Sequence, residues 1–110
     1  MNLNHEPAPV ACNLNAMTQA QRERHIVVLN QLRKLVEQIS ELPDGYAFIY
    51  PVEAGLFMAA AEFVTLESLC CSFFKFRLEF ERGNGSFTLT LSGPPESKPI
   101  MLAALRGKTG

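Results

Sequence analysis

The chain has 110 residues, 47% of them hydrophobic, which suits one small domain with a single core. Ten basic and eleven acidic residues give a formal net charge of -1, so the broad positive field needed for nucleic-acid binding is missing and we expect no nucleic-acid partner. The longest apolar run near the middle, Ala54 to Ala61, is far shorter than the roughly 20 residues that cross a bilayer, so no membrane span is predicted.

Residues 1–17 predict a flexible N-terminal tail, because they contain two prolines and four asparagines without periodic apolar spacing. The first residues lack the basic and apolar regions of a secretory signal, so we expect a cytoplasmic protein with its cysteines kept as thiols. The three cysteines are Cys12 in this tail and the adjacent pair Cys70 and Cys71. An odd number that includes two neighbours does not form a complete disulfide framework.

A long helix is predicted from about Gln19 to Glu41. Thr18 and Gln21 match a capping box at its start. Apolar residues then recur along one face, at Leu29, Leu32, Val36 and Ile39. This spacing also permits pairing with the same helix of a second chain, so a homodimer is one expectation.

The remaining chain predicts the order β-α-β-β-α. A Leu-Pro-Asp-Gly turn at 42–45 leads into a strand at 46–50, and helical spacing follows from residue 52 to about 71. Alternating apolar and polar residues predict two strands joined by a hairpin loop at 83–85, and the last helix covers about 98–106.

We therefore predict an α+β fold with a three-stranded mixed sheet and helices packed on one face. A right-handed crossover followed by a hairpin favours strand order 1-3-2, like a ferredoxin-like plait without its last strand. A single domain would cover residues 18–107, with a short C-terminal tail at 108–110. The long first helix is additional to that plan.

The predicted middle helix carries a carboxylate on its apolar face. At about 100° per residue, Glu67, Cys70 and Cys71 lie on the same side as Leu56 and Phe63. A carboxylate buried without partners is so costly that it takes up a proton, finds an ion-pair partner or binds a cation. The two thiols, at i+3 and i+4, are its nearest neighbours on the helix face.

Three interpretations of the cysteine pair stay open. A disulfide between neighbours is the least favoured, because a trans peptide holds their Cα atoms about 3.8 Å apart, below the usual range of about 4.4–6.8 Å. The cysteines could simply pack as small buried hydrophobes. Alternatively, they form a redox-active or soft-metal cluster, since thiolates favour ions such as Cu(I) and Zn²⁺.

A metal site would need further ligands. Cys12 is the first candidate for a third thiol, because a mobile tail can fold over a site at small entropic cost. His5 and His25 are the other candidates, although His5 falls in the predicted tail and His25 is better explained as a half-buried packing residue. The expected ligand set is Cys70, Cys71, Glu67 and Cys12, with a soft thiophilic metal or metalloid ion as cofactor.

Four segments together resemble a group of small, largely uncharacterised bacterial proteins. They are Cys12-Asn13-Leu14, Leu42-Pro43-Asp44-Gly45-Tyr46-Ala47-Phe48, Leu66-Glu67-Ser68-Leu69-Cys70-Cys71-Ser72-Phe73 and Leu91-Ser92-Gly93-Pro94. Ser72 stands where the group has a proline that would end the helix. The resemblance implies that Cys12, Glu67, Cys70 and Cys71 belong to one pattern, and it implies no activity.

The function predicted from these observations is soft metal or metalloid binding, or redox sensing, through the vicinal cysteines. The alternative is a non-catalytic, homodimeric protein-interaction module whose cysteines only pack. No catalytic residues are assigned, because no acid/base pair is visible beyond Glu67 and the thiols.

Overall fold

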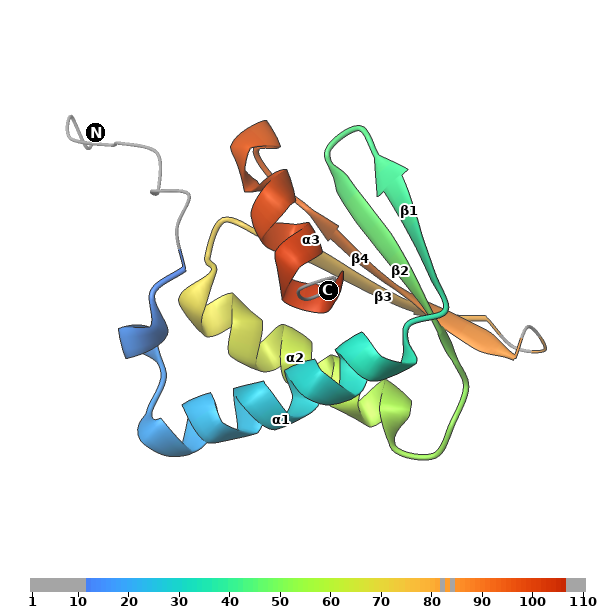
Figure 1. Cartoon of the computed structure of the whole chain (residues 1–110), viewed down its shortest axis with the longest axis horizontal. Coiled ribbons are helices and arrows are strands. Elements are labelled where there is room, and N and C mark those ends of the chain that lie inside the picture. Colours follow the sequence, from blue (N-terminus) through green and yellow to red (C-terminus); the bar gives the residue numbers. More distant parts are fainter. Residues whose placement is uncertain (1–11, 82, 84, 107–110) are drawn as a thin grey trace.

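A computed structural model describes residues 12–81, 83 and 85–106 of the chain. Residues 1–11 of the predicted 1–17 tail, including His5, and the predicted C-terminal tail at 108–110 lie outside these residues. The described elements, in chain order, are a 3-10 turn Leu14–Ala16, α1 (Gln19–Leu35), β1 (Gln38–Leu42), β2 (Gly45–Pro51), α2 (Leu56–Cys70), β3 (Lys75–Phe80), β4 (Ser86–Ser92), a 3-10 turn Pro95–Ser97 and α3 (Lys98–Arg106) (Figure 1).

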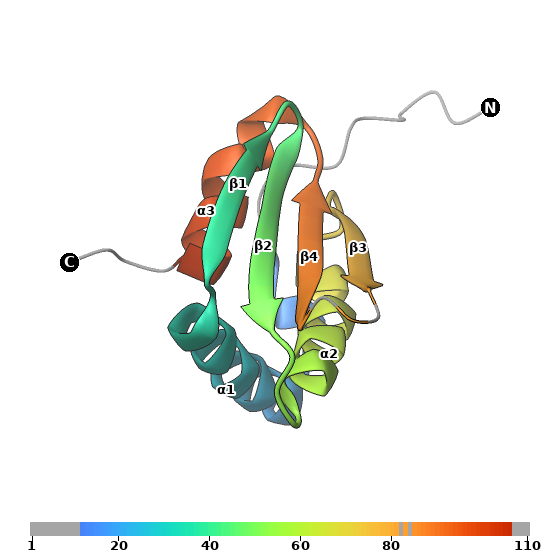
Figure 2. The same cartoon turned by 90° about the vertical axis from the view of Figure 1, so that its right-hand side faces the viewer.

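The sheet corrects the predicted architecture. It has four strands in the order β1-β2-β4-β3, and every neighbouring pair is antiparallel. The predicted three-stranded mixed sheet is therefore wrong, although the α+β class is correct. The three helices cover one face of this sheet, and none of the described helices lies on the opposite face (Figure 2).

The extra strand comes from the end of the predicted long helix. Helix α1 stops at Leu35, where Val36 turns to extended backbone with φ -64° and ψ 129°. Residues 38–42 then pair with β2, with Ile39 opposite Phe48. Ile39 has helical spacing from Leu32 and Val36, but it also alternates with polar neighbours as a strand residue does. The five residue pairs between β1 and β2, closed by a tight turn, therefore decide that this segment is a strand and not the end of a helix.

Helix α1 begins as predicted. Thr18 accepts a hydrogen bond from the backbone N–H of Gln21, and the Gln21 side chain accepts one from the backbone N–H of Thr18, which confirms the capping box. Its apolar stripe packs into the chain's own core, where Leu29 and Leu32 are buried. The stripe therefore gives no support to the predicted homodimer, which stays a prediction.

The core lies between the sheet and the helices. Alternate strand residues face inward and meet the buried side of α2; these inward residues are Phe48, Tyr50, Phe87, Leu89 and Leu91. Helices α1 and α2 lie side by side beneath α3 (Figure 1). No helix in the described part of the chain is both long enough and apolar enough to cross a membrane. The packing of α1 on α2 creates the buried environment of the cysteines.

Candidate functional site

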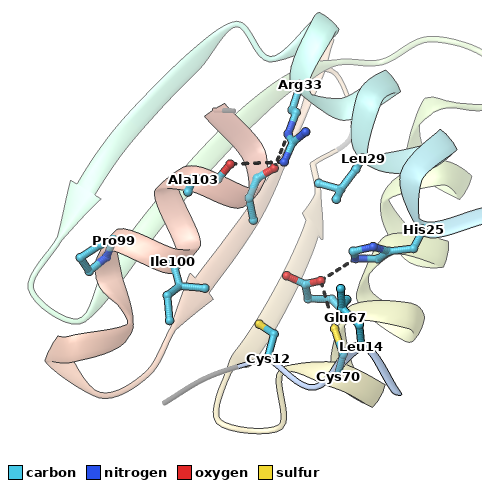
Figure 3. A pocket seen from close by; sticks show the side chains of 11 residues that line it. Cys12, Leu14, His25, Leu29, Arg33, Glu67, Cys70, Pro99, Ile100 and Ala103 are labelled. Atoms are coloured by element: carbon cyan, nitrogen blue, oxygen red, sulfur yellow. Dashed lines mark hydrogen bonds and ion pairs between the residues drawn. The ribbon is translucent and has the colours of Figure 1, made fainter. Parts of the chain in front are cut away.

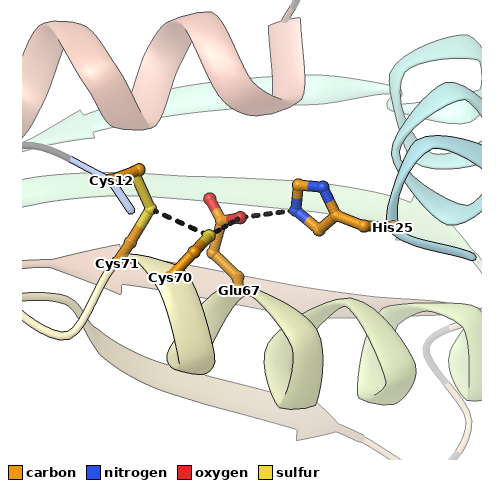
Figure 4. Close-up of a disulfide and its surroundings, with 5 residues drawn as sticks. All are labelled: Cys12, His25, Glu67, Cys70 and Cys71. Carbon is orange, nitrogen blue, oxygen red and sulfur yellow. Dashed lines mark hydrogen bonds and ion pairs between the residues drawn. A yellow bond between two sulfur atoms is a disulfide. The ribbon is translucent and has the colours of Figure 1, made fainter. Parts of the chain in front are cut away.

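The C-terminal turn of α2 holds the carboxylate and the cysteine pair. Glu67, Cys70 and Cys71 are only 3%, 4% and 0% exposed, so the predicted apolar face of this helix includes all three. Helix α2 ends at Cys70, and the backbone N–H of Cys71 donates to the Glu67 carbonyl at 2.7 Å. The helix thus ends within the cysteine pair, and both sulfurs lie close together at the end of α2 (Figure 4).

Cys71 forms a disulfide with Cys12. Their Cα atoms are 4.5 Å apart and the bridge joins residues 59 positions apart in the sequence. The expectation that all three cysteines are thiols is therefore wrong for two of them. A hydrogen bond beside the bridge also attaches this segment to the end of α2, because the Asn13 N–H donates to the Cys70 carbonyl at 2.8 Å. The side chain of Met17 is only 3% exposed, and its burial in the core further holds the segment that follows Cys12.

Cys70 is a free, buried thiol beside this disulfide. Its sulfur lies 3.6 Å from the sulfur of Cys71, and its S–H donates to Glu67 Oε1 at 3.7 Å (Figure 4). Burial, followed by the charge and the hydrogen bond of Glu67, raises the pKa of the Cys70 thiol to about 11. At neutral pH Cys70 is therefore held as a thiol and not as the reactive thiolate.

This raised pKa predicts how Cys70 responds to alkylation. In the oxidised protein, the rate of reaction with iodoacetamide should rise about tenfold per pH unit from pH 7 and level off only near pH 11, because thiolate is the reacting species. An ordinary cysteine would level off near pH 9. A plateau near pH 8 or 9 for Cys70, measured by intact mass with Cys70→Ser as the blank, would contradict the assignment.

His25 on α1 is the partner of the buried carboxylate. Its Nε2 lies 2.6 Å from Glu67 Oε1, and the imidazole stacks on Phe63 with ring centroids 6.1 Å apart. Of the three outcomes expected for a buried Glu67, pairing is the one observed. From the sequence, His25 was a candidate metal ligand that was better explained as a half-buried packing residue. His25 lies four residues before Leu29, on the same face of the helix, and this spacing was the sequence signal that it faces α2.

The described residues offer two overlapping sets of metal ligands. The sulfurs of Cys12, Cys70 and Cys71 lie within 4.8 Å of one another, as do donor atoms of His25, Glu67 and Cys70. The expected residues Cys12, Glu67, Cys70 and Cys71 therefore share one small region, with His25 added. While the disulfide is intact, Cys12 and Cys71 have no thiolate to offer an ion, so only the second set is available.

A cavity of about 420 Å³ opens beside these groups (Figure 3). Cys12, Glu67, Cys70 and His25 line one end, and Arg33 lies at the other end. Arg33 donates through Nε to the Ala104 carbonyl at 2.7 Å, which ties α1 to the C-terminal end of α3. The remaining walls are mostly apolar, and they come from Leu14, Leu29, Pro99, Ile100, Ala103 and Ala104.

Comparison of the chain with models of protein families, with curated proteins and with solved structures gave no match. The resemblance to the group of small bacterial proteins stays a prediction.

Proposed function

We propose that this is a redox-responsive thiol protein in which Cys12 and Cys71 alternate between a disulfide and two thiols. Its main support is the arrangement of three sulfurs within 4.8 Å, two of them bonded and the third, on Cys70, free. A third sulfur at 3.6 Å gives the bridge a route for thiol–disulfide exchange.

The predicted cytoplasmic location adds to this proposal. In a compartment where thiols are kept reduced, disulfides are usually transient and serve catalysis or redox sensing. Oxidation would then be an event to which the protein responds.

The structural consequence of switching would fall on the segment that starts at Cys12. This segment is attached to the end of α2 by the disulfide and by the hydrogen bond from Asn13 to Cys70. Reduction removes the covalent attachment and leaves one hydrogen bond and the burial of Met17. Cys12 also lines the cavity, so reduction loosens part of the cavity wall.

Cycles of oxidation and reduction test the proposal. Full-length protein is treated with diamide and then with dithiothreitol, and the free thiols are counted at each stage by alkylation and intact mass. Wild type should gain and lose one Cys12–Cys71 bridge repeatedly, Cys70→Ser should lose it more slowly because the neighbouring thiol is gone, and Cys12→Ser should not form it. Failure of the folded protein to form this bridge, or failure of dithiothreitol to reverse it, would reject the proposal.

The reduced protein is the basis of a second candidate function, which is binding of a soft ion. Three thiols whose sulfurs lie within 4.8 Å suit a three-coordinate thiophilic ion such as Cu(I), and Glu67 lies beside them as a ligand or proton acceptor. Cu(I) should raise the melting temperature of reduced wild type and leave that of the oxidised protein unchanged. An equal shift in Cys70→Ser/Cys71→Ser would rule out these thiols as the ligands.

A further inference from the structure

The cavity and the sulfurs form one continuous site. A volume of about 420 Å³ falls in the range of pockets that hold small organic molecules. Its walls are predominantly apolar, and Cys12 and Cys70 both line it. Two other oxidants of thiols match this cavity poorly. Hydrogen peroxide has no apolar group to bury there, and the several charges of oxidised glutathione would lie against apolar walls without partners.

One polar atom at the sulfur end is free to bind a ligand. Glu67 Oε1 is engaged by His25 at 2.6 Å and by the Cys70 S–H at 3.7 Å. The other oxygen, Oε2, makes no hydrogen bond within the described part of the chain, and it points into the cavity (Figure 3). Since Glu67 is only 3% exposed, an acceptor is presented inside an otherwise apolar space. It would fix the orientation of a ligand that carries a hydrogen-bond donor.

We infer that the oxidant for this site is an organic hydroperoxide, with its hydrocarbon group in the cavity and its O–O–H donating to Glu67 Oε2. The inference rests on the proposed redox function and names the substrate class for it. An organic hydroperoxide combines an apolar body, a hydrogen-bond donor and an oxygen that oxidises sulfur, and it can fit a volume of this size.

The reaction would pass through Cys12. The Cys12 thiol gives its proton to the Glu67–His25 pair, and the sulfur attacks the terminal peroxide oxygen. The O–O bond breaks, the pair returns the proton to the leaving alkoxide, and the products are a Cys12 sulfenic acid and an alcohol. The Cys71 thiol then attacks the sulfenic sulfur and water leaves, giving the Cys12–Cys71 disulfide. Two thiols lose two electrons and the peroxide gains them.

The exposure of the cysteines favours this order of events. Cys12 is the most exposed of the three and lines the cavity, whereas Cys71 is fully buried and suits the second, intramolecular step. Cys70 is only 4% exposed and its S–H is already donated to Glu67 Oε1, so it is less accessible to an oxidant than Cys12. Cys70 is left as the thiol for later exchange with the bridge.

Stopped-flow oxidation of the fully reduced chain tests the inference. Cumene hydroperoxide should form the disulfide more than about tenfold faster than hydrogen peroxide at equal concentration, since a pocketed hydrocarbon group commonly contributes such a factor. The rate should also saturate with cumene hydroperoxide and stay linear with hydrogen peroxide.

A cavity-filling variant provides the matched comparison. Ala103 is exposed on α3 and lines the cavity, so Ala103→Phe should remove most of the preference for cumene hydroperoxide without slowing oxidation by diamide. Ala20→Phe, an exposed alanine of α1 away from the cavity, should keep the preference.

Equal, non-saturating rates with the two peroxides, or an Ala103→Phe variant with an unchanged preference, would overturn the hydroperoxide assignment and leave the redox function standing. If even diamide fails to produce a reversible Cys12–Cys71 bridge, both the redox function and the hydroperoxide assignment fall.

Discussion

Cys12→Ser is expected to lower the free energy of unfolding of the oxidised protein by about 2–4 kcal/mol. The bridge to Cys71 spans 59 positions, and closing a loop of that length removes a large part of the entropy of the unfolded chain. Urea unfolding of wild type and variant, both without reductant, measures the difference. The variant should unfold at clearly lower urea with a similar slope.

Dithiothreitol provides the control for this prediction. Once the bridge of the wild type is reduced, its unfolding curve should move onto that of Cys12→Ser, because the serine replaces a thiol at the exposed end of the bridge. Coinciding curves in the absence of reductant would show that the bridge contributes nothing to stability.

His25→Phe is expected to destabilise the protein by about 3–5 kcal/mol. Phenylalanine keeps a ring against Phe63, but it leaves the Glu67 carboxylate buried without the partner now 2.6 Å away. Removing one member of a buried pair leaves the full cost of desolvating the other. Thermal and urea unfolding at neutral pH measure this cost.

The double variant His25→Phe/Glu67→Leu separates the charge from the packing. Because it removes both polar partners, it should recover most of the stability lost in His25→Phe. A double variant as unstable as the single one would mean that the imidazole acts through its shape and that the pair with Glu67 contributes little.

Part of this site follows from helical geometry alone. Steps of 100° place Glu67 on the apolar face of α2 with Cys70 and Cys71 beside it, and all three are buried in the structure. The cost of burying a carboxylate also indicated that Glu67 needs a partner. Which side chain meets it depends on how α1 packs on α2, and periodicity within each helix does not specify that contact.

The Cys12–Cys71 bridge was beyond prediction for a different reason. The segment around Cys12 has no apolar period, and its attachment depends on Met17 and on the Asn13 hydrogen bond to the end of α2. Strand β1 was missed because Val36 and Ile39 fit a helix stripe as well as a strand, and only the pairing with β2 decides between them.

The reduction potential of the Cys12–Cys71 pair in the full-length protein tests the redox switch most directly. Equilibration with glutathione buffers, followed by acid quenching and alkylation, gives the fraction oxidised at each potential. A switch requires a value above about -300 mV, where cellular thiols can reduce the bridge. A value well below about -300 mV would mark a permanent structural disulfide and contradict the proposed function.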